Sequence, residues 1–194
     1  MALQVLRAQD RTPAPWKNGG GVTSEVAAHP EGARTDDFVW RVSIADVAQS
    51  GPFSVFEGVD RIITVVHGPG MALTVDGVRH VVAVPYEPFA FAGDSDTQCE
   101  LLGGPIVDFN VMVRRADASA RVRIVRDRVT VRPEAGTCVL AVVLHGAATL
   151  GRESVRLDHL DAALFTAADA DADDIDVAVD GVLAVVTVTD HDSD

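Results

Sequence analysis

Hydrophobic and polar residues alternate with a period of two in many short stretches of the chain, a pattern typical of half-buried β-strands. Residues 41–47, Arg-Val-Ser-Ile-Ala-Asp-Val, show this alternation most clearly. Other stretches that alternate or are rich in β-branched residues are 61–66, 71–75, 78–84, 109–113, 121–125, 139–144, 155–157 and 182–188. Many short strands of this kind predict an all-β fold, either a barrel or a sandwich.

Turn signals separate some of these strands. Asp76-Gly77 stands between the strands 71–75 and 78–84 and predicts a hairpin, because Asp-Gly readily adopts the left-handed backbone of a two-residue turn. Asp180-Gly181 predicts another turn. The Ala- and Asp-rich residues 158–172 leave two alternatives open, a helix or a short strand at 162–166.

The sequence contains a weak internal repeat. Val65-Val66-His67-Gly68 recurs as Val143-Leu144-His145-Gly146, 78 positions later. Residues 89–92 align with 164–167, and 109–113 with 184–188, both at an offset of 75. A nearly constant offset across three segments favours a duplicated β unit, although Val-rich strands also align by chance. In both copies the His-Gly pair is expected at a hairpin turn.

Length and charge narrow the class of protein. The 194 residues suffice for one large domain or two small, fused ones. The net charge is −13, and 11 of the 29 acidic residues follow Leu157, where no Lys or Arg occurs. This acidity argues against a general nucleic-acid binder and against docking to anionic membranes.

Nothing in the sequence indicates export. The amino terminus lacks the basic and apolar regions of a signal peptide, and no apolar run reaches the length of a membrane span. Cys99 and Cys138 form no Cys-x-x-Cys pair, so we interpret them as buried, reduced thiols. We therefore expect a cytoplasmic protein.

The first candidate for chemistry is the segment 15–23, Pro-Trp-Lys-Asn-Gly-Gly-Gly-Val-Thr. Three successive glycines are entropically costly and need a reason, such as a positive φ or the close approach of a backbone or a ligand. Lys17 is the only Lys beside 15 Arg, and Asn18 is one of only two Asn. Their joint presence in one loop favours a specific role. A tight surface turn, with Trp16 packed on the core, is the alternative.

Two strands offer further candidates. Alternation places Arg41 and Ser43 on one face of their strand, where Arg41 could clamp a carboxylate if that face lines a barrel interior. Asn110, Met112 and Arg114 share a face of another strand and resemble the wall of a small-molecule site. The alternatives are a solvent face and a strand edge facing water. Phe89 and Phe91 are better explained as core aromatics.

Metal and nucleophile motifs are missing from the sequence. The six histidines form neither His-x-His nor His-x-x-x-His, and no Gly-x-Ser-x-Gly elbow occurs. The Asp-rich segment 169–176 lacks the glycine and the terminal Glu of an EF-hand loop, so we interpret it as a solvated acidic surface. We expect no bound metal and no cofactor.

Five ordered motifs together resemble the HutD/Ves family and cover roughly residues 3–115. They are Pro-Trp-Lys-Asn-Gly-Gly-Gly-Val-Thr at 15–23, Trp-Arg-Val-Ser-Ile-Ala-Asp-Val at 40–47, Gly-Pro-Phe-Ser-x-Phe-x-Gly-Val-Asp-Arg at 51–61, Pro-Tyr-Glu-Pro-Phe-Ala-Phe-x-Gly-Asp at 85–94, and Asp-Phe-Asn-Val-Met at 108–112. The second half matches mainly by pattern, and its aspartate-rich end is a departure from the family.

The resemblance implies a bicupin, two cupin-type β-barrels packed in one chain. Residues 1–115 would form the first barrel with the ligand pocket, and residues 116–194 a second, acidic barrel. The resemblance also implies a cytoplasmic bacterial protein associated with histidine utilisation, without the usual cupin metal histidines. The family's motif residues correspond to Trp16, Lys17, Asn18, Gly19, Gly20, Arg41, Ser43, Arg61 and Asn110.

Three functional hypotheses follow. The first is a regulatory protein that binds a small carboxylate metabolite, such as a formyl- or formimino-glutamate intermediate of histidine breakdown, through Lys17, Arg41 and Arg61. The second is an amide or formyl hydrolase or an isomerase, with Lys17 in the site and Asp46 or Glu87 as the partner acid. The third is a protein-interaction module, and a homodimer stays open. Neither nucleic acid nor membrane is an expected partner.

Overall fold

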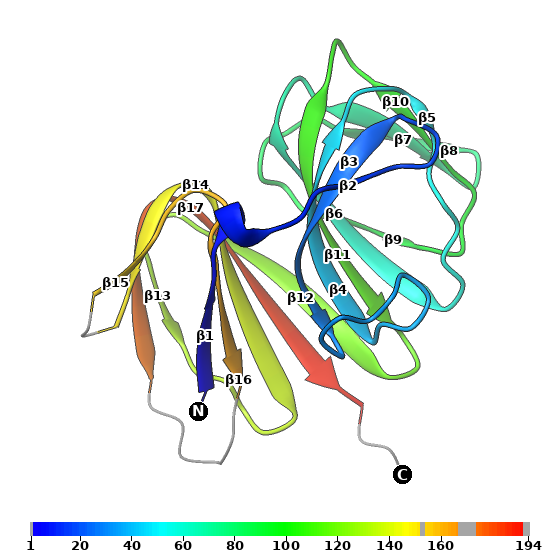
Figure 1. The fold of residues 1–194 in the computed structure, drawn as a ribbon. Helices are drawn as coiled ribbons and strands as arrows, with labels where there is room; N and C mark the ends of the chain where they lie inside the picture. The colour runs from blue at the N-terminus through cyan, green and yellow to red at the C-terminus, as the bar shows by residue number, and fades with distance from the viewer. Residues whose placement is uncertain (1, 152–153, 167–173, 192–194) are drawn as a thin grey trace. The chain divides into compact units, whose positions relative to one another are not determined.

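The all-β prediction is confirmed by the computed structural model, which describes residues 2–151, 154–166 and 174–191. These residues form 17 strands and one short 3₁₀ turn, η1 (Ala8–Asp10). The chain divides into two compact units, one of Thr12–Asp117 and one of Met1–Arg11 with Ala118–Asp194 (Figure 1). Across the described ranges no helix has the length and apolar character needed to span a membrane.

The division differs from the expected boundary at residues 115 and 116 in one respect. The chain passes into the second unit between Asp117 and Ala118, close to the expected boundary. Residues 1–11, however, belong to the unit that contains Ala118–Asp194. The reason is that β1 (Ala2–Leu6) pairs antiparallel with β16 (Ala162–Thr166) over five residue pairs. Local periodicity predicts a strand but not its partner, so the sequence alone does not show that the first strand belongs to the unit formed by the second half of the chain.

The Thr12–Asp117 unit consists of two antiparallel sheets. The six-stranded sheet has the order β2 (Ala14–Pro15), β3 (Gly21–His29), β4 (Trp40–Val47), β11 (Ile106–Arg114), β6 (Val59–His67), β9 (Phe89–Ala92). The four-stranded sheet has the order β5 (Gly51–Pro52), β10 (Thr97–Leu101), β7 (Met71–Val75), β8 (Val78–Val82). One apolar cluster joins the sheets, with Ile63 and Val65 from the first and Met71, Leu73 and Cys99 from the second.

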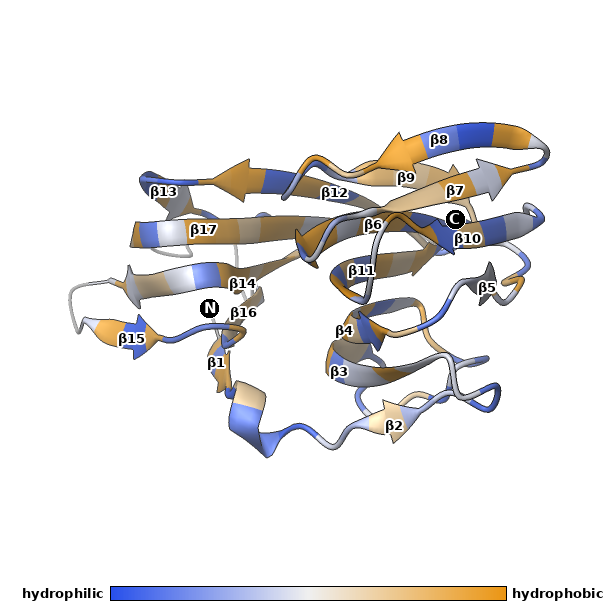
Figure 2. Ribbon diagram, turned by 90° about the horizontal axis from the view of Figure 1, so that it is seen from above, coloured by the Kyte–Doolittle hydropathy of each residue, from blue (hydrophilic) through white to orange (hydrophobic). Residues whose placement is uncertain are grey.

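The other unit is built on a single seven-stranded sheet with the path β1-β16-β14-β17-β12, to which β13 and β15 add at the sides. Its strands beyond β1 and β16 are β12 (Ala118–Val125), β13 (Arg128–Val131), β14 (Thr137–Leu150), β15 (Val155–Leu157) and β17 (Ile175–Asp190). Hydrophobic and hydrophilic bands follow one another along β14 and β17 in Figure 2. Residues 139–144 of β14 and 182–186 of β17 are all buried, so in these parts side chains on both faces are covered.

The expected strands are present, most of them longer than the sequence pattern indicated. Three match residue for residue, at 71–75, 155–157 and 162–166, and the strand expected at 78–84 ends earlier, at Val82. Between the alternatives for residues 158–172, the strand at 162–166 is observed, whereas residues 167–172 lie outside the described part. Asp76 and Gly77 have φ values of 47° and 82°, the left-handed backbone that the predicted hairpin requires.

The turn predicted at Asp180-Gly181 is wrong, and so is the turn predicted at His145-Gly146. Both pairs lie inside long strands, β17 and β14, where Gly146 pairs directly with Gly181. The two backbones approach so closely that a Cβ on Gly146 would overlap the carbonyl oxygen of Asp180, and one on Gly181 that of His145. The glycines therefore serve a close approach of two strands at a register shift, not a chain reversal.

The internal repeat is supported by strand pairing. In the Thr12–Asp117 unit the paired residues of β6 and β11 include Arg61–Met112, Ile63–Asn110 and Val65–Asp108. In the other unit the paired residues of β14 and β17 include Val139–Thr187, Ala141–Val185 and Val143–Leu183. Each residue of the second set lies 78 or 75 positions after its counterpart, which are the offsets found in the sequence. The two units thus share one pairing scheme.

The close approach of β14 and β17 predicts an unequal cost for two similar substitutions. Gly146 and Gly136 have nearly equal φ values, 74° and 70°, but a Cβ on Gly136 would meet no atom within 4 Å. Gly136→Ala should therefore cost only about 1 kcal/mol of backbone strain. Gly146→Ala adds a backbone clash and should cost more than about 3 kcal/mol. Urea unfolding of both full-length variants checks this, and equal costs would contradict the close approach.

Candidate functional site

Polar side chains lie on the core face of the six-stranded sheet. Ser43, Asn110 and Ile63 stand opposite one another on the adjacent strands β4, β11 and β6. Because side chains alternate between faces, residues two positions away share this face. The face that carries the apolar Ile63 and Val65 therefore also carries Arg41, Asp108 and Arg61. The structure thus brings four expected residues, Arg41, Ser43, Arg61 and Asn110, onto one surface.

Arg61 is the buried cation of this face. It is 7% exposed, and its guanidinium carbon lies 5.0 Å from the ring centres of Phe53 and Phe91 and 5.6 Å from that of Phe56. No carboxylate of the described residues lies within ion-pair distance, and Nε has no hydrogen-bond partner there. Burial lowers the pKa of Arg61 to about 10, against the opposing attraction of Asp108, so it stays charged at neutral pH.

Asp108 is the buried acid of the same face. It is 3% exposed, and within the described part of the chain no hydrogen-bond donor reaches its carboxylate. Burial raises its pKa to about 7, with Arg61 acting in the opposite direction and Asp46 in the same direction. The group can therefore be either charged or neutral near neutral pH.

Two further polar residues flank this pair. Asn110 is 9% exposed, and its Oδ1 accepts no hydrogen bond from the described residues. Arg41 is partly buried, and its Nε donates to Glu25 Oε2 on β3 at 2.8 Å. The expected clamping of a ligand carboxylate by Arg41 therefore competes with a resident carboxylate that already accepts from its Nε.

Backbone conformation and local packing explain most of the sequence of the glycine-rich loop before β3. Gly19 has a φ of 72°, and a Cβ on Gly21 would lie 2.6 Å from the Asp46 carbonyl oxygen and 3.2 Å from the Trp16 ring. Asn18 Oδ1 accepts the Gly20 amide at 3.0 Å. Trp16 packs against the core and donates from Nε1 to Thr23 Oγ1 at 2.7 Å, as the surface-turn alternative expected.

Lys17 lies in this loop and is exposed. Its ammonium forms no ion pair within the described residues, so neither Asp46 nor Glu87, both exposed, is its partner. Lys17 is thus free to meet an anion from solvent but is not held in a defined position.

Arg114 does not join the expected wall beside Asn110 and Met112. Its guanidinium donates to the carbonyl oxygens of Phe38 at 3.2 Å and Asp36 at 2.9 Å. It also lies 5.8 Å from the centre of the Phe38 ring. Arg114 therefore stabilises the loop before β4.

The other unit shows that the fold does not need this polar set. By the shared pairing scheme, Arg61, Asp108 and Asn110 correspond to Val139, Leu183 and Val185, which belong to an apolar core. Burying a charged or amide group without partners costs free energy that a valine does not. Polar residues where the same fold tolerates aliphatic ones indicate a function other than folding.

Sequence reasoning missed Asp108, Glu25 and the rings of Phe53 and Phe56. Asp108 was visible as a polar residue at a core-facing position of an apolar strand. Glu25 could not be assigned, because a register shift between Glu25 and Ala27 breaks the simple alternation of β3. The two rings lie within the motif 51–61, but only the structure brings them to Arg61.

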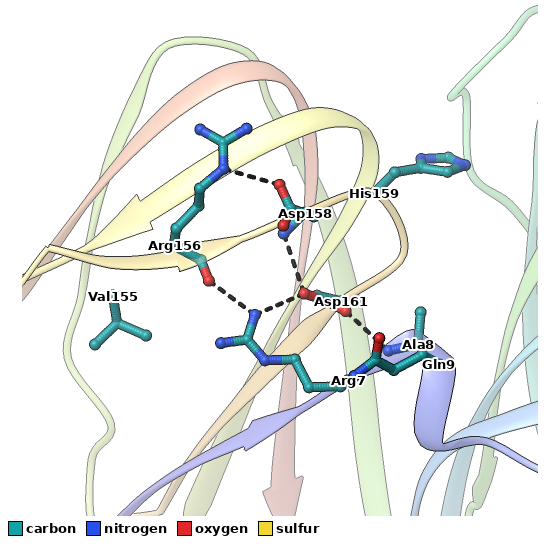
Figure 3. A pocket seen from close by; sticks show the side chains of 8 residues that line it. All are labelled: Arg7, Ala8, Gln9, Val155, Arg156, Asp158, His159 and Asp161. Carbon is teal, nitrogen blue, oxygen red and sulfur yellow. Dashed lines mark hydrogen bonds and ion pairs between the residues drawn. The ribbon is translucent and has the colours of Figure 1, made fainter.

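A cavity of about 610 Å³ lies in the other unit (Figure 3). Asp161 accepts from Arg7 at 2.7 Å, from the Ala8 amide at 2.8 Å and from the Asp158 amide at 3.1 Å. Arg156 donates to Asp158 at 2.8 Å. The Arg and Asp side chains that line this cavity are thus paired with one another. Their contacts hold the amino-terminal segment against this unit, so these groups are already engaged within the protein.

Metal and thiol chemistry have little support in the described residues. None of their His, Cys, Asp and Glu side chains gather in groups of three or more that could hold a metal. Asp169, Asp171 and Asp173 lie outside these residues, while Asp174 pairs with Arg132 at 3.4 Å. Burial raises the pKa of the Cys99 and Cys138 thiols to about 11 and 12, which disfavours the nucleophilic thiolate.

The burial of Asp108 predicts a pH-dependent stability. Its pKa of about 7 in the folded chain lies above the ordinary value of 3.8, so the folded chain binds more protons between these values. The contribution to stability is therefore full below about pH 4 and is lost as the pH rises through 7. Asp108→Asn removes this loss and should be more stable than the parent at pH 8 by about 1–4 kcal/mol.

Urea unfolding at pH 5 and pH 8 measures the difference between the two proteins. Asp46→Asn, the same change at an exposed site, is the control and should change stability little at either pH. A parent and an Asp108→Asn variant with parallel pH profiles would refute the burial of an ionisable Asp108.

Comparisons with known proteins show the family and the fold of the chain. A protein of Pseudomonas putida, "Uncharacterized 21.2 kDa protein in hutC 3'region", is 50% identical over 121 residues, 62% of this chain and 63% of that protein. The matched region thus spans less than two thirds of that relative.

Solved structures extend the likeness to almost the whole chain. HutD from Pseudomonas fluorescens SBW25, in a formate condition, is 38% identical with a TM-score of 0.84, covering 98% of this chain and all of that one. A cupin 2 conserved barrel domain protein from Leptotrichia buccalis is 8% identical with a TM-score of 0.58, covering 97% and 96%, and shows a cupin-like fold. The HutD family model matches residues 8–185, so the chain belongs to the HutD family.

Proposed function

We propose that the protein binds a small carboxylate metabolite on the polar core face of the Thr12–Asp117 unit. We further propose that the ligand is a formyl- or formimino-glutamate intermediate of histidine degradation, bound without a metal. The observation that carries the proposal is Arg61, a buried guanidinium without an ion-pair partner among the described residues.

The surroundings of Arg61 suit an anion. Three aromatic rings around the guanidinium exclude water, and their faces stabilise the positive charge. In such an environment a charge-assisted hydrogen bond contributes about 1.5–3 kcal/mol, more than it would in water. A planar carboxylate also matches the fork of donors that a guanidinium presents.

The neighbouring polar groups support a ligand with a second polar end. Asn110 offers an acceptor without a donor, and Ser43 lies beside it on the adjacent strand. Arg41, with Glu25, adds a charged pair further along the same face. In this proposal Trp16, Asn18, Gly19 and Gly20 shape the loop next to the site, and Lys17 contributes a mobile positive charge.

The relatives' names support the metabolic context. One is named for its position in the hutC 3' region and another is HutD, both of which point to the histidine-utilisation locus. We therefore assign the protein a regulatory, cytoplasmic role in histidine utilisation, with ligand binding as its molecular activity. The common pairing scheme of the two units and the cupin-like neighbour support a bicupin arrangement.

Removal of the buried cation tests the proposal. Calorimetric titration with formate, N-formyl-L-glutamate and N-formimino-L-glutamate should show binding of at least one of them to the parent protein. Arg61→Met keeps the length of the side chain but loses the charge, and should weaken that binding by roughly 10- to 150-fold. Lys17→Ala should weaken it by only a few fold, because the ammonium is solvated.

Arg79→Met is the matched control. Arg79 is an exposed residue of β8 that pairs with Glu100 at 3.1 Å, away from the polar core face. Its loss should leave affinity unchanged. If none of the three carboxylates binds, or if Arg61→Met binds them as the parent does, the assigned site is wrong.

A further inference from the structure

We propose that Asp108 adjusts its own charge to the end group of the ligand: a ligand with a neutral end group enters together with one proton, which Asp108 takes up, whereas a ligand with a cationic nitrogen enters without that proton. This inference rests on the proposed function and names the residue that distinguishes neutral from cationic end groups.

Two opposite charges share this face but do not meet. Asp108 on β11 and Arg61 on β6 are 3% and 7% exposed, and no ion pair joins them. The pKa of Asp108 is shifted by burial and by the charges of Arg61 and Asp46, with no hydrogen bond among the causes, and Nε of Arg61 has no hydrogen-bond partner among the described residues. Both groups therefore have unused capacity toward a ligand on this face.

The ionisable neighbours of Asp108 are few. Besides Arg61, they are Cys99 on β10 and the exposed Asp46 on β4. The charge of Asp108 helps to raise the pKa of the Cys99 thiol, and the charge of Asp46 helps to raise the pKa of Asp108. Further along the face, Arg41 and Glu25 neutralise each other at 2.8 Å.

His80 of β8 packs on Phe89 with ring centres 4.9 Å apart. His80, Lys17 and Asp46 all have access to solvent, so Arg61 and Asp108 are the charged groups that are buried at the site.

A carboxylate placed on Arg61 disturbs this balance. Arg61 and an ionised Asp108 sum to zero, so an additional anion leaves the buried face with an uncompensated negative charge, which a low-dielectric environment penalises. A proton on Asp108 restores the neutrality of Arg61, Asp108 and that carboxylate. The second carboxylate of a glutamate derivative adds the same charge whichever end group is present, so it does not change the comparison. The pKa of about 7 supports this step, because protonation of Asp108 near neutral pH costs little.

The two states of Asp108 suit different end groups. A protonated Asp108 donates its O–H to a carbonyl oxygen, as in a formyl amide. An ionised Asp108 accepts from the N–H of a protonated formimino group, which also supplies the missing positive charge. N-formyl- and N-formimino-L-glutamate share the same skeleton and differ in this end group, so they form a matched pair of probes.

The experiment is calorimetric titration of the full-length protein at pH 8 in two buffers with different ionisation enthalpies, which measures proton uptake. The parent should take up about one more proton with N-formyl-L-glutamate than with N-formimino-L-glutamate. Its affinity for the formyl compound should fall by about tenfold per pH unit above pH 7, the slope for one linked proton.

Asp108→Asn should abolish both effects, because a neutral amide neither gains nor loses a proton. The variant should bind the formyl compound at pH 8 as tightly as the parent binds it at pH 6. Asp46→Asn, the same change at an exposed neighbour, should retain the proton uptake. The two-buffer measurement on the parent needs no variant, so it stands even where a substitution reduces folding.

The outcomes separate the two proposals. Equal proton uptake for the two compounds, or an unchanged pH profile in Asp108→Asn, overturns the role of Asp108 while the binding site stands. Absence of binding by both compounds to the parent and to Asp108→Asn at pH 6 and pH 8 overturns the proposed function and this inference together.

Discussion

The antiparallel pairing of β6 with β11 is the constraint on which the candidate site depends. Its register places Arg61, Ile63 and Val65 opposite Met112, Asn110 and Asp108, so that all six side chains share one face. A shift of β6 by one residue would turn Arg61 to the other face and away from Asp108 and Asn110 of β11. The irregularity between Val107 and Asp108 keeps this register for the buried part of β11 while His67 pairs beyond it. The backbone hydrogen bonds between β6 and β11 thus determine which polar side chains lie together on this face.

The other unit uses the same pairing for an ordinary core. Between β14 and β17 the corresponding positions hold Val139, Leu183 and Val185, all buried. The repeated scheme is therefore stable with aliphatic side chains alone, and the charges of Arg61 and Asp108 are additions to it. Isolated buried charges reduce stability unless a partner compensates them. At these positions the Thr12–Asp117 unit therefore carries buried charges without an ion-pair partner among the described residues, whereas the other unit carries aliphatic side chains.

Local patterns predicted the strands well, because period-two alternation and β-branching act over a few residues. The repeat at offsets of 78 and 75 even anticipated the shared register. Patterns failed where the determining contact is distant. Gly181 signals a turn by sequence but meets Gly146 inside two long strands, and β1 pairs with β16 across more than 150 residues. Glu25 is paired with Arg41 of the neighbouring strand, a contact that the pattern within β3 does not reveal.

The scarcity of Lys and Asn in the sequence singled out Lys17 and Asn18 as candidate ligand-binding residues. The structure gives these two residues different roles. Asn18 is explained by the backbone amide of Gly20, and Lys17 is exposed without an ion-pair partner in the described chain. The buried cation is instead Arg61, one of 15 arginines and inconspicuous by count. Composition reports how often a residue is used, whereas affinity depends on how completely its charge is desolvated. A solvated Lys17 can attract an anion over roughly a Debye length of 8–10 Å. Retaining that anion requires a charge that water cannot screen, and on this face only the pairing of β6 with β11 supplies one.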